Sequence, residues 1–132
     1  MSDAREAFDR LLALQEEHER GPKREGVFAV WLLARIACDM GMEDGDADRA
    51  ARRRLALLDR RLAPLAVPRP LARGLTAALA HLQDGTPAAA RIALSQLVAP
   101  VRESLGPEAG EAIAVLARTL HDTQRRETRE AT

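Results

Sequence analysis

Apolar residues recur along this chain every three to four positions, which is the repeat of a helix with one buried face. In the clearest stretch they lie at i, i+4, i+7 and i+11, namely Ala51, Leu55, Leu58 and Leu62. Glycines and prolines separate the periodic stretches and predict where the helices end. The pattern predicts six helices, over about residues 3–20, 25–40, 47–63, 70–83, 87–105 and 107–122.

The second stretch is apolar on most of its circumference, as expected of a helix that other helices cover. Its apolar run from Val27 to Ala34 is too short to span a bilayer. We therefore expect an all-α fold, a compact bundle of five to six short antiparallel helices around a central apolar helix at about 25–40. The residues expected in its core are Trp31, Leu32, Leu33 and Ile36.

Several helix ends are predicted from local signals. Thr86 and Pro87 are of the types found at an N-cap and a first helical position, directly after a stop at Asp84-Gly85. Pro100 lies inside the fifth stretch and is expected to kink or split that helix near Ala99. In the first helix the expected core stripe is Ala4, Ala7, Phe8, Leu11, Leu12 and Leu14.

The composition also favours helices, since 26 alanines and 19 leucines stand against six valines and three isoleucines. A chain of 132 residues is long enough for one domain with its own core. We assign residues 1–122 to a single helical domain and expect the polar tail 123–132 to fray. The chain shows weak self-similarity at a spacing of 40 residues. This does not decide whether residues 27–106 form a helical-hairpin repeat.

Cys38 is the only cysteine, which excludes an intramolecular disulfide and argues against a cysteine-based zinc site. The N-terminal residues lack the apolar segment of a secretory signal, so we expect a cytoplasmic protein with no membrane partner. His18, His81 and His121 lie on separate segments, and no catalytic motif surrounds them. We expect no catalysis, no cofactor, no metal and no specific small-molecule ligand.

Charge is unevenly distributed although the formal net charge is zero. Residues 1–48 carry twelve acidic and six basic residues, whereas residues 49–105 carry ten arginines and three acidic residues. Residues 106–132 are nearly balanced, with five acidic residues and four arginines. Such asymmetry directs one part of a chain towards an oppositely charged partner or towards another part of the protein.

The basic region contains the candidate contacts. At about 100° per residue, Arg49, Arg53 and Arg60 share the side of the third helix opposite its leucines. The candidates for contact with a nucleic-acid backbone or an acidic partner are Arg49, Arg52, Arg53, Arg60, Arg69 and Arg73. A solvated helix face is the alternative, as is the arginine bias of a GC-rich genome, because 19 of the 20 basic residues are arginine.

Small and apolar residues in the stretch at about 33–54 also form a pattern: Ile36, Ala37, Met40, Gly41, Met42, Ala47 and Ala50. This pattern resembles the general helix-turn-helix of DNA-binding proteins, and no particular family within it. The second helix of that motif enters the major groove with its first residues. Here those residues are acidic and would be repelled by phosphates: Glu43, Asp44, Asp46 and Asp48. A structural hairpin whose acids cap a helix N-terminus is the other interpretation.

These observations favour a non-catalytic helical protein-interaction module, either an adaptor or a small subunit of a larger assembly, with a homodimer as one form. An alanine-rich core buries little apolar area per residue, so association would add burial at about 25 cal/mol per Å². An exposed apolar patch beside the charged faces is expected. The alternative is a nucleic-acid-binding protein, either a helix-turn-helix-like regulator or a small helical subunit that contacts phosphates through its arginines.

Overall fold

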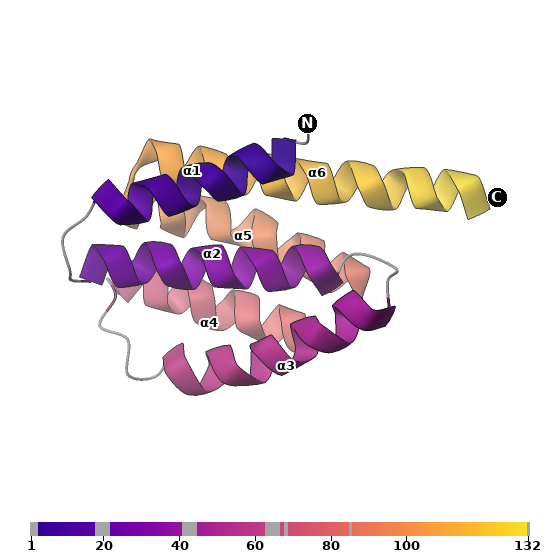
Figure 1. Ribbon diagram of the computed structural model, residues 1–132, viewed down its shortest axis with the longest axis horizontal. Coiled ribbons are helices and arrows are strands. Elements are labelled where there is room, and N and C mark those ends of the chain that lie inside the picture. The colour runs from indigo at the N-terminus through magenta and orange to yellow at the C-terminus, as the bar shows by residue number, and fades with distance from the viewer. Residues whose placement is uncertain are drawn as a thin grey trace.

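The computed structural model describes residues 3–17, 22–40, 45–62, 67, 69–84 and 86–131. Over these residues it contains six helices and no strand, which confirms the predicted all-α class. The helices are α1 (Asp3–Glu17), α2 (Pro22–Met40), α3 (Gly45–Leu62), α4 (Arg69–Gln83), α5 (Pro87–Leu105) and α6 (Pro107–Ala131). Successive helices run back and forth in an antiparallel bundle (Figure 1). None of the described helices is long and apolar enough to cross a membrane.

Helix α2 is the centre of the bundle, as expected. It contacts each of the other five helices, whereas α1 and α3 each contact two, counted over the residues that the structure describes. The side chains of α2 that are fully buried, with at most 1% exposure, are Val27, Ala29, Val30, Leu33, Ala34, Ile36 and Ala37. The apolar circumference of this segment is therefore used mostly for packing.

Trp31 and Leu32 are only partly buried, so their placement in the core is wrong. The reason is the position of α1 and α3, which both pack on α2 but do not contact one another over the described residues. One stripe of α2 is left uncovered between them. Leu12 of α1 lies beside Trp31 and is 39% exposed, so its assignment to the core stripe is also wrong.

The α4–α5 hairpin begins its second helix as predicted, because the Thr86 hydroxyl accepts a hydrogen bond of 3.1 Å from the Ala89 amide. We expected Pro100 to kink or split α5 near Ala99. The helix is continuous through Pro100, so there is no split, and the kink stays a prediction. The Pro100 ring lies against Gly74 of α4, where an added Cβ would come within 2.8 Å of the ring Cγ. The missing side chain at Gly74 gives the ring room without a break in α5.

Helix α6 continues to Ala131, past the domain end assigned at residue 122. Its last turns extend beyond the end of α1 (Figure 1). The fraying of residues 123–132, the single domain over 1–122 and the hairpin repeat stay predictions. The connection at 41–44 and the side chains of Leu58 and Leu62 lie outside what the structure describes.

Candidate interaction surface

The uncovered stripe of α2 carries large apolar side chains between α1 and α3. Phe28 and Trp31 stack with their ring centroids 6.3 Å apart, and Leu32 follows on the same side of the helix. The indole nitrogen of Trp31 is itself buried, and no described residue accepts a hydrogen bond from it. Two aromatic rings and a leucine of the central helix thus remain partly accessible.

A hollow of about 410 Å³ lies beside this stripe, where α1 meets α2. Its lining comes from Ala4, Arg5, Phe8, Asp9 and Leu12 of α1 and from Trp31 and Arg35 of α2. The Arg35 guanidinium carbon stands 5.4 Å from the centroid of the Phe8 ring, which is a cation–π distance. This contact holds Arg35 at the edge of the hollow.

Asp39 joins the same side of α2 to α3. Its carboxylate oxygen lies 3.3 Å from Nη1 of Arg54 and 3.9 Å from Nε of Arg35. Because Arg54 reaches this side of α2, Leu57, three residues later, lies on the same side of α3. Leu57 is 53% exposed and adds a large apolar side chain to the surface of α3. We call the set Leu12, Phe28, Trp31, Leu32 and Leu57 the α2 patch.

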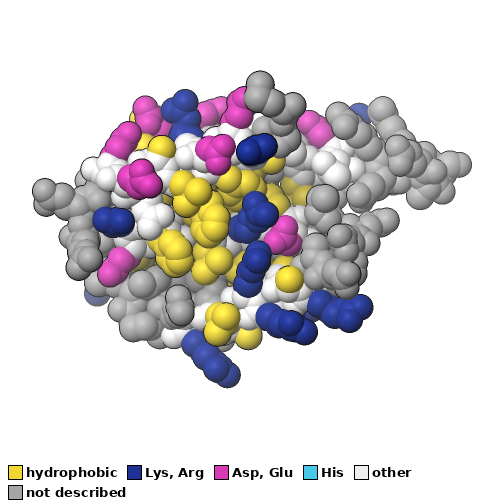
Figure 2. Space-filling view, in the orientation of Figure 1, with side chains coloured by type: hydrophobic (Ala, Val, Ile, Leu, Met, Phe, Trp, Pro, Cys, Tyr) yellow, Lys and Arg dark blue, Asp and Glu magenta, His cyan; other side chains and the backbone are white. Residues whose placement is uncertain are grey.

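Charges of opposite sign flank the α2 patch. Acidic side chains gather along the edge formed by α1 and α6, arginines gather along α3, and apolar surface lies between them (Figure 2). Next to Leu12, the exposed acids of α1 are Asp9 and Glu16. The residues one turn before and after Leu57 are Arg53 and Arg60, both exposed. The charge asymmetry of the sequence is therefore also an asymmetry of the surface.

All six predicted contact arginines are exposed. Four of them lie on α3, while Arg69 and Arg73 lie on α4, which touches α3. The acids whose position would decide between the helix-turn-helix and the hairpin fall outside the described residues or side chains. Helix α3 runs back along α2 in Figure 1, which supports the interpretation as an αα-hairpin.

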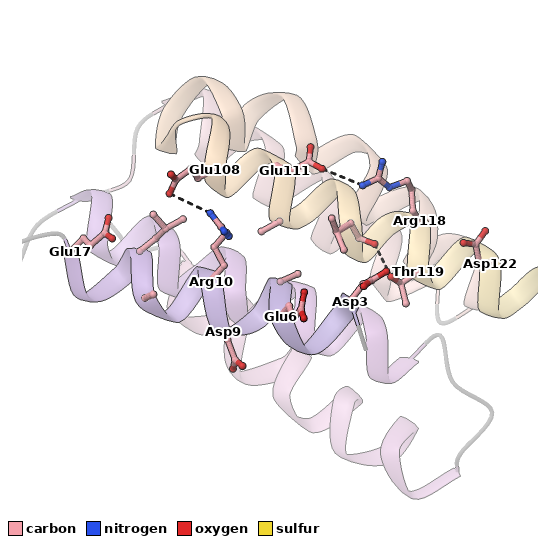
Figure 3. Close-up of a pocket in the computed structure, with 15 residues that line it drawn as sticks. Asp3, Glu6, Asp9, Arg10, Glu17, Glu108, Glu111, Arg118, Thr119 and Asp122 are labelled. Atoms are coloured by element: carbon pink, nitrogen blue, oxygen red, sulfur yellow. Dashed lines mark hydrogen bonds and ion pairs between the residues drawn. The ribbon is translucent and has the colours of Figure 1, made fainter. Parts of the chain in front are cut away.

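A second concave surface, of about 780 Å³, lies between α1 and α6 (Figure 3). Its acidic residues are Asp3, Glu6, Asp9, Glu17, Glu108, Glu111 and Asp122, and its apolar lining is Ala7, Ala13, Leu14, Ala112 and Val115. Arg10 reaches across the groove to Glu108 at 3.8 Å, and Arg118 pairs with Glu111 at 3.2 Å. Two of the acids are thus already paired with arginines that line the same groove.

The acidic walls of this groove have a local signal in the sequence. Asp3, Glu6 and Asp9 recur at a spacing of three, and so do Glu108 and Glu111. This spacing places acids on one side of each helix. That the first and last helices lie side by side is a long-range property that no local pattern reveals.

Cys38, His81 and His121 each have neighbours within the described bundle. Burial raises the pKa of the Cys38 thiol to about 12, with repulsion from Asp39 adding to the shift and attraction to Arg35 opposing it. The His81 Nε2 atom lies 3.0 Å from Gln96 Oε1, which links α4 to α5. His121 Nδ1 lies 3.3 Å from an Arg91 nitrogen on α5. No group of three or more histidine, cysteine, aspartate or glutamate side chains in the described part could hold a metal ion.

In comparisons with protein-family models, curated proteins and solved structures, none matches this chain. Its function must therefore be inferred from its own surfaces.

Proposed function

We propose that this chain is a non-catalytic helical protein-interaction module that docks a protein partner on the α2 patch. The observation that supports this function is the stripe of Phe28, Trp31 and Leu32 on the central helix. Neither α1 nor α3 covers this stripe fully. An apolar surface rimmed by polar residues is typical of interaction sites, and tryptophan is enriched among the residues that contribute most to binding.

The face formed by α1, α2 and α3 is large enough for a specific interface. Helix α2 has 19 residues, which corresponds to a length of about 28 Å at about 1.5 Å per residue. Three helices of this length, spaced about 8–10 Å apart, then form a face with an area of roughly 800 Å². One partner contributes about 800 Å² to a protein interface of standard size.

A matched pair of leucine and isoleucine variants tests this function. Leu57→Ser alters the α2 patch, whereas Ile92→Ser alters a residue of 38% exposure on α5. Over the described part of the chain, α5 contacts neither α1 nor α3. Immobilised protein is exposed to extract from its own source cells, and retained chains are cross-linked and identified. A chain retained by the wild type and by Ile92→Ser, but lost with Leu57→Ser, is the expected result. Equal retention by all three proteins would contradict the proposal.

Nucleic-acid binding is a second candidate, favoured by the exposure of all six arginines on two touching helices. Binding to phosphates weakens steeply as salt is raised, because condensed counterions are released. Fluorescence anisotropy of labelled DNA and RNA at low and near-physiological salt measures this directly. Salt-dependent binding that is lost on changing Arg52, Arg53 and Arg60 to Glu would support this candidate. No binding at low salt would remove it.

A further inference from the structure

We infer that the partner on the α2 patch is a second copy of this chain, related to the first by a two-fold axis that runs parallel to α2. This inference rests on the proposed docking function and names its partner. It follows from the order in which charged and apolar surfaces cross the face formed by α1, α2 and α3 (Figure 2).

Across this face α1 carries mostly acids, with Arg5 among them, α2 carries the apolar stripe together with Arg35 and Asp39, and α3 carries mostly arginines. A half-turn about an axis parallel to α2 turns the face over and exchanges its two edges. The acidic edge of each copy then lies opposite the basic edge of the other, while the two apolar stripes lie opposite one another. A two-fold axis across the helices would instead place acid against acid. Charge complementarity therefore selects one of the two isologous arrangements.

At the level of residues, the arrangement pairs the exposed acids Asp9 and Glu16 with the exposed bases Arg53 and Arg60. Because the two copies are related by a two-fold axis, the contact between the acidic edge of one copy and the basic edge of the other occurs twice. Trp31 lies near the axis and becomes covered by the same stripe of the other copy. The edges cannot satisfy each other within one copy, since α1 and α3 do not touch over the described residues.

The charge pattern also argues against a different kind of partner. A purely acidic partner would be repelled by α1, and a purely basic partner would be repelled by α3. A second copy carries both edges in the required order. Its formal net charge of zero adds no long-range repulsion between copies.

A charge exchange between the two edges tests the arrangement by sedimentation equilibrium. The wild type is expected at twice the 14.4 kDa chain mass in the micromolar range. Arg53→Glu/Arg60→Glu makes both edges acidic, and Asp9→Arg/Glu16→Arg makes both edges basic. Each variant alone should dissociate at least tenfold more readily than the wild type. An equimolar mixture should regain the dimer, because both edge contacts again join opposite charges.

A variant with the same net charge change serves as the control. Arg73→Glu/Arg102→Glu alters exposed residues of α4 and α5. It should dimerise as the wild type does, and in its mixture with Asp9→Arg/Glu16→Arg the latter should stay as dissociated as it is alone. Circular dichroism verifies that each variant is helical. A wild type that stays monomeric, a mixture that does not associate, or an equal effect of the control mixture would overturn the inference. If Leu57→Ser still abolished capture of another protein, the docking function would stand without self-association.

Discussion

At the scale of single residues, glycines set how closely neighbouring helices approach. A Cβ at Gly110 of α6 would lie 2.8 Å from Cβ and 3.1 Å from Cα of Arg102 on α5. Gly110→Ala should therefore lower the free energy of unfolding by about 2 kcal/mol, since overpacking forces backbone to move. Urea denaturation measures the loss.

Gly26→Ala is the matched comparison for this prediction. Its new Cβ would meet Leu71 Cδ2 at 2.9 Å, which is the movable end of a side chain. Gly26→Ala should therefore lower the free energy of unfolding by less than Gly110→Ala does. Equal costs would show that the backbone of α5 yields as readily as a leucine side chain.

The N-cap of α5 is a second prediction at this scale. Thr86→Ala removes the acceptor of the Ala89 amide hydrogen bond and should cost about 1 kcal/mol of unfolding free energy. Thr76→Ala is the control, because the Thr76 hydroxyl only donates to the Ala72 carbonyl in the preceding turn of α4. Thermal or urea unfolding compares the two, and a loss at Thr76 as large as that at Thr86 would contradict the role of the cap.

Cys38 leads to a prediction about pH. Its pKa is raised from an ordinary 9.0 to about 12, so above pH 9 the unfolded state releases a proton that the folded state keeps. Stability should therefore fall as pH rises from 9 to 12, by less than about 1.4 kcal/mol per pH unit. Below pH 9 the thiol is protonated in both states, so Cys38 contributes no pH dependence to the unfolding free energy.

The comparison for this effect is Cys38→Ala, whose cavity cost does not depend on pH. The difference in unfolding free energy between the wild type and Cys38→Ala should shrink above pH 9. In the folded protein the thiol should react slowly with disulfide reagents at pH 8. A constant difference together with fast labelling would show that the thiol is not desolvated.

At the scale of elements, α3 has fewer buried side chains than any other helix, counted over the described residues. Among its described side chains only Ala51 and Leu55 are buried, and it contacts only α2 and α4. The ion pair between Arg54 and Asp39 adds a link, but it is partly exposed, so Asp39→Asn should cost less than about 1 kcal/mol. The expected result is faster amide hydrogen exchange in α3, with α5 and α6 unchanged.

Glu111→Gln is the control for this element, since among the described residues Glu111 pairs with Arg118 of its own helix. It should leave exchange in α3 as in the wild type. Faster exchange throughout the bundle after Asp39→Asn would show that Asp39 supports the whole fold and not the attachment of α3.

Helix positions could be read from the sequence because their signals are local. Thr86, Pro87 and the glycine stops each act within a turn, and every described helix overlaps the range predicted for it. Trp31 and Leu32 were misplaced because their burial depends on whether α1 and α3 meet, which is a property of the assembled bundle. The packing of the Pro100 ring against Gly74 could not be predicted, because Gly74 is 26 residues away in the sequence.

At the scale of the whole molecule, the sequence identified the arginines but not the surface to which they belong. The exposure of Arg53 and Arg60 follows from helical periodicity. These arginines and the acids of α1 lie on opposite sides of α2. No spacing in the sequence predicts that arrangement. The acidic groove between α1 and α6 was missed for the same reason, since it joins the two ends of the chain.

The most direct test of the central claim is the fluorescence of Trp31, the only tryptophan, as a function of protein concentration. If the α2 patch is covered by a second copy, the emission maximum should move to longer wavelength on dilution. This shift should occur at the concentration at which the mass falls from dimer to monomer. For Arg53→Glu/Arg60→Glu the same shift should occur at a protein concentration at least tenfold higher than for the wild type. An emission maximum that does not change while the mass doubles would place the contact elsewhere and contradict the account.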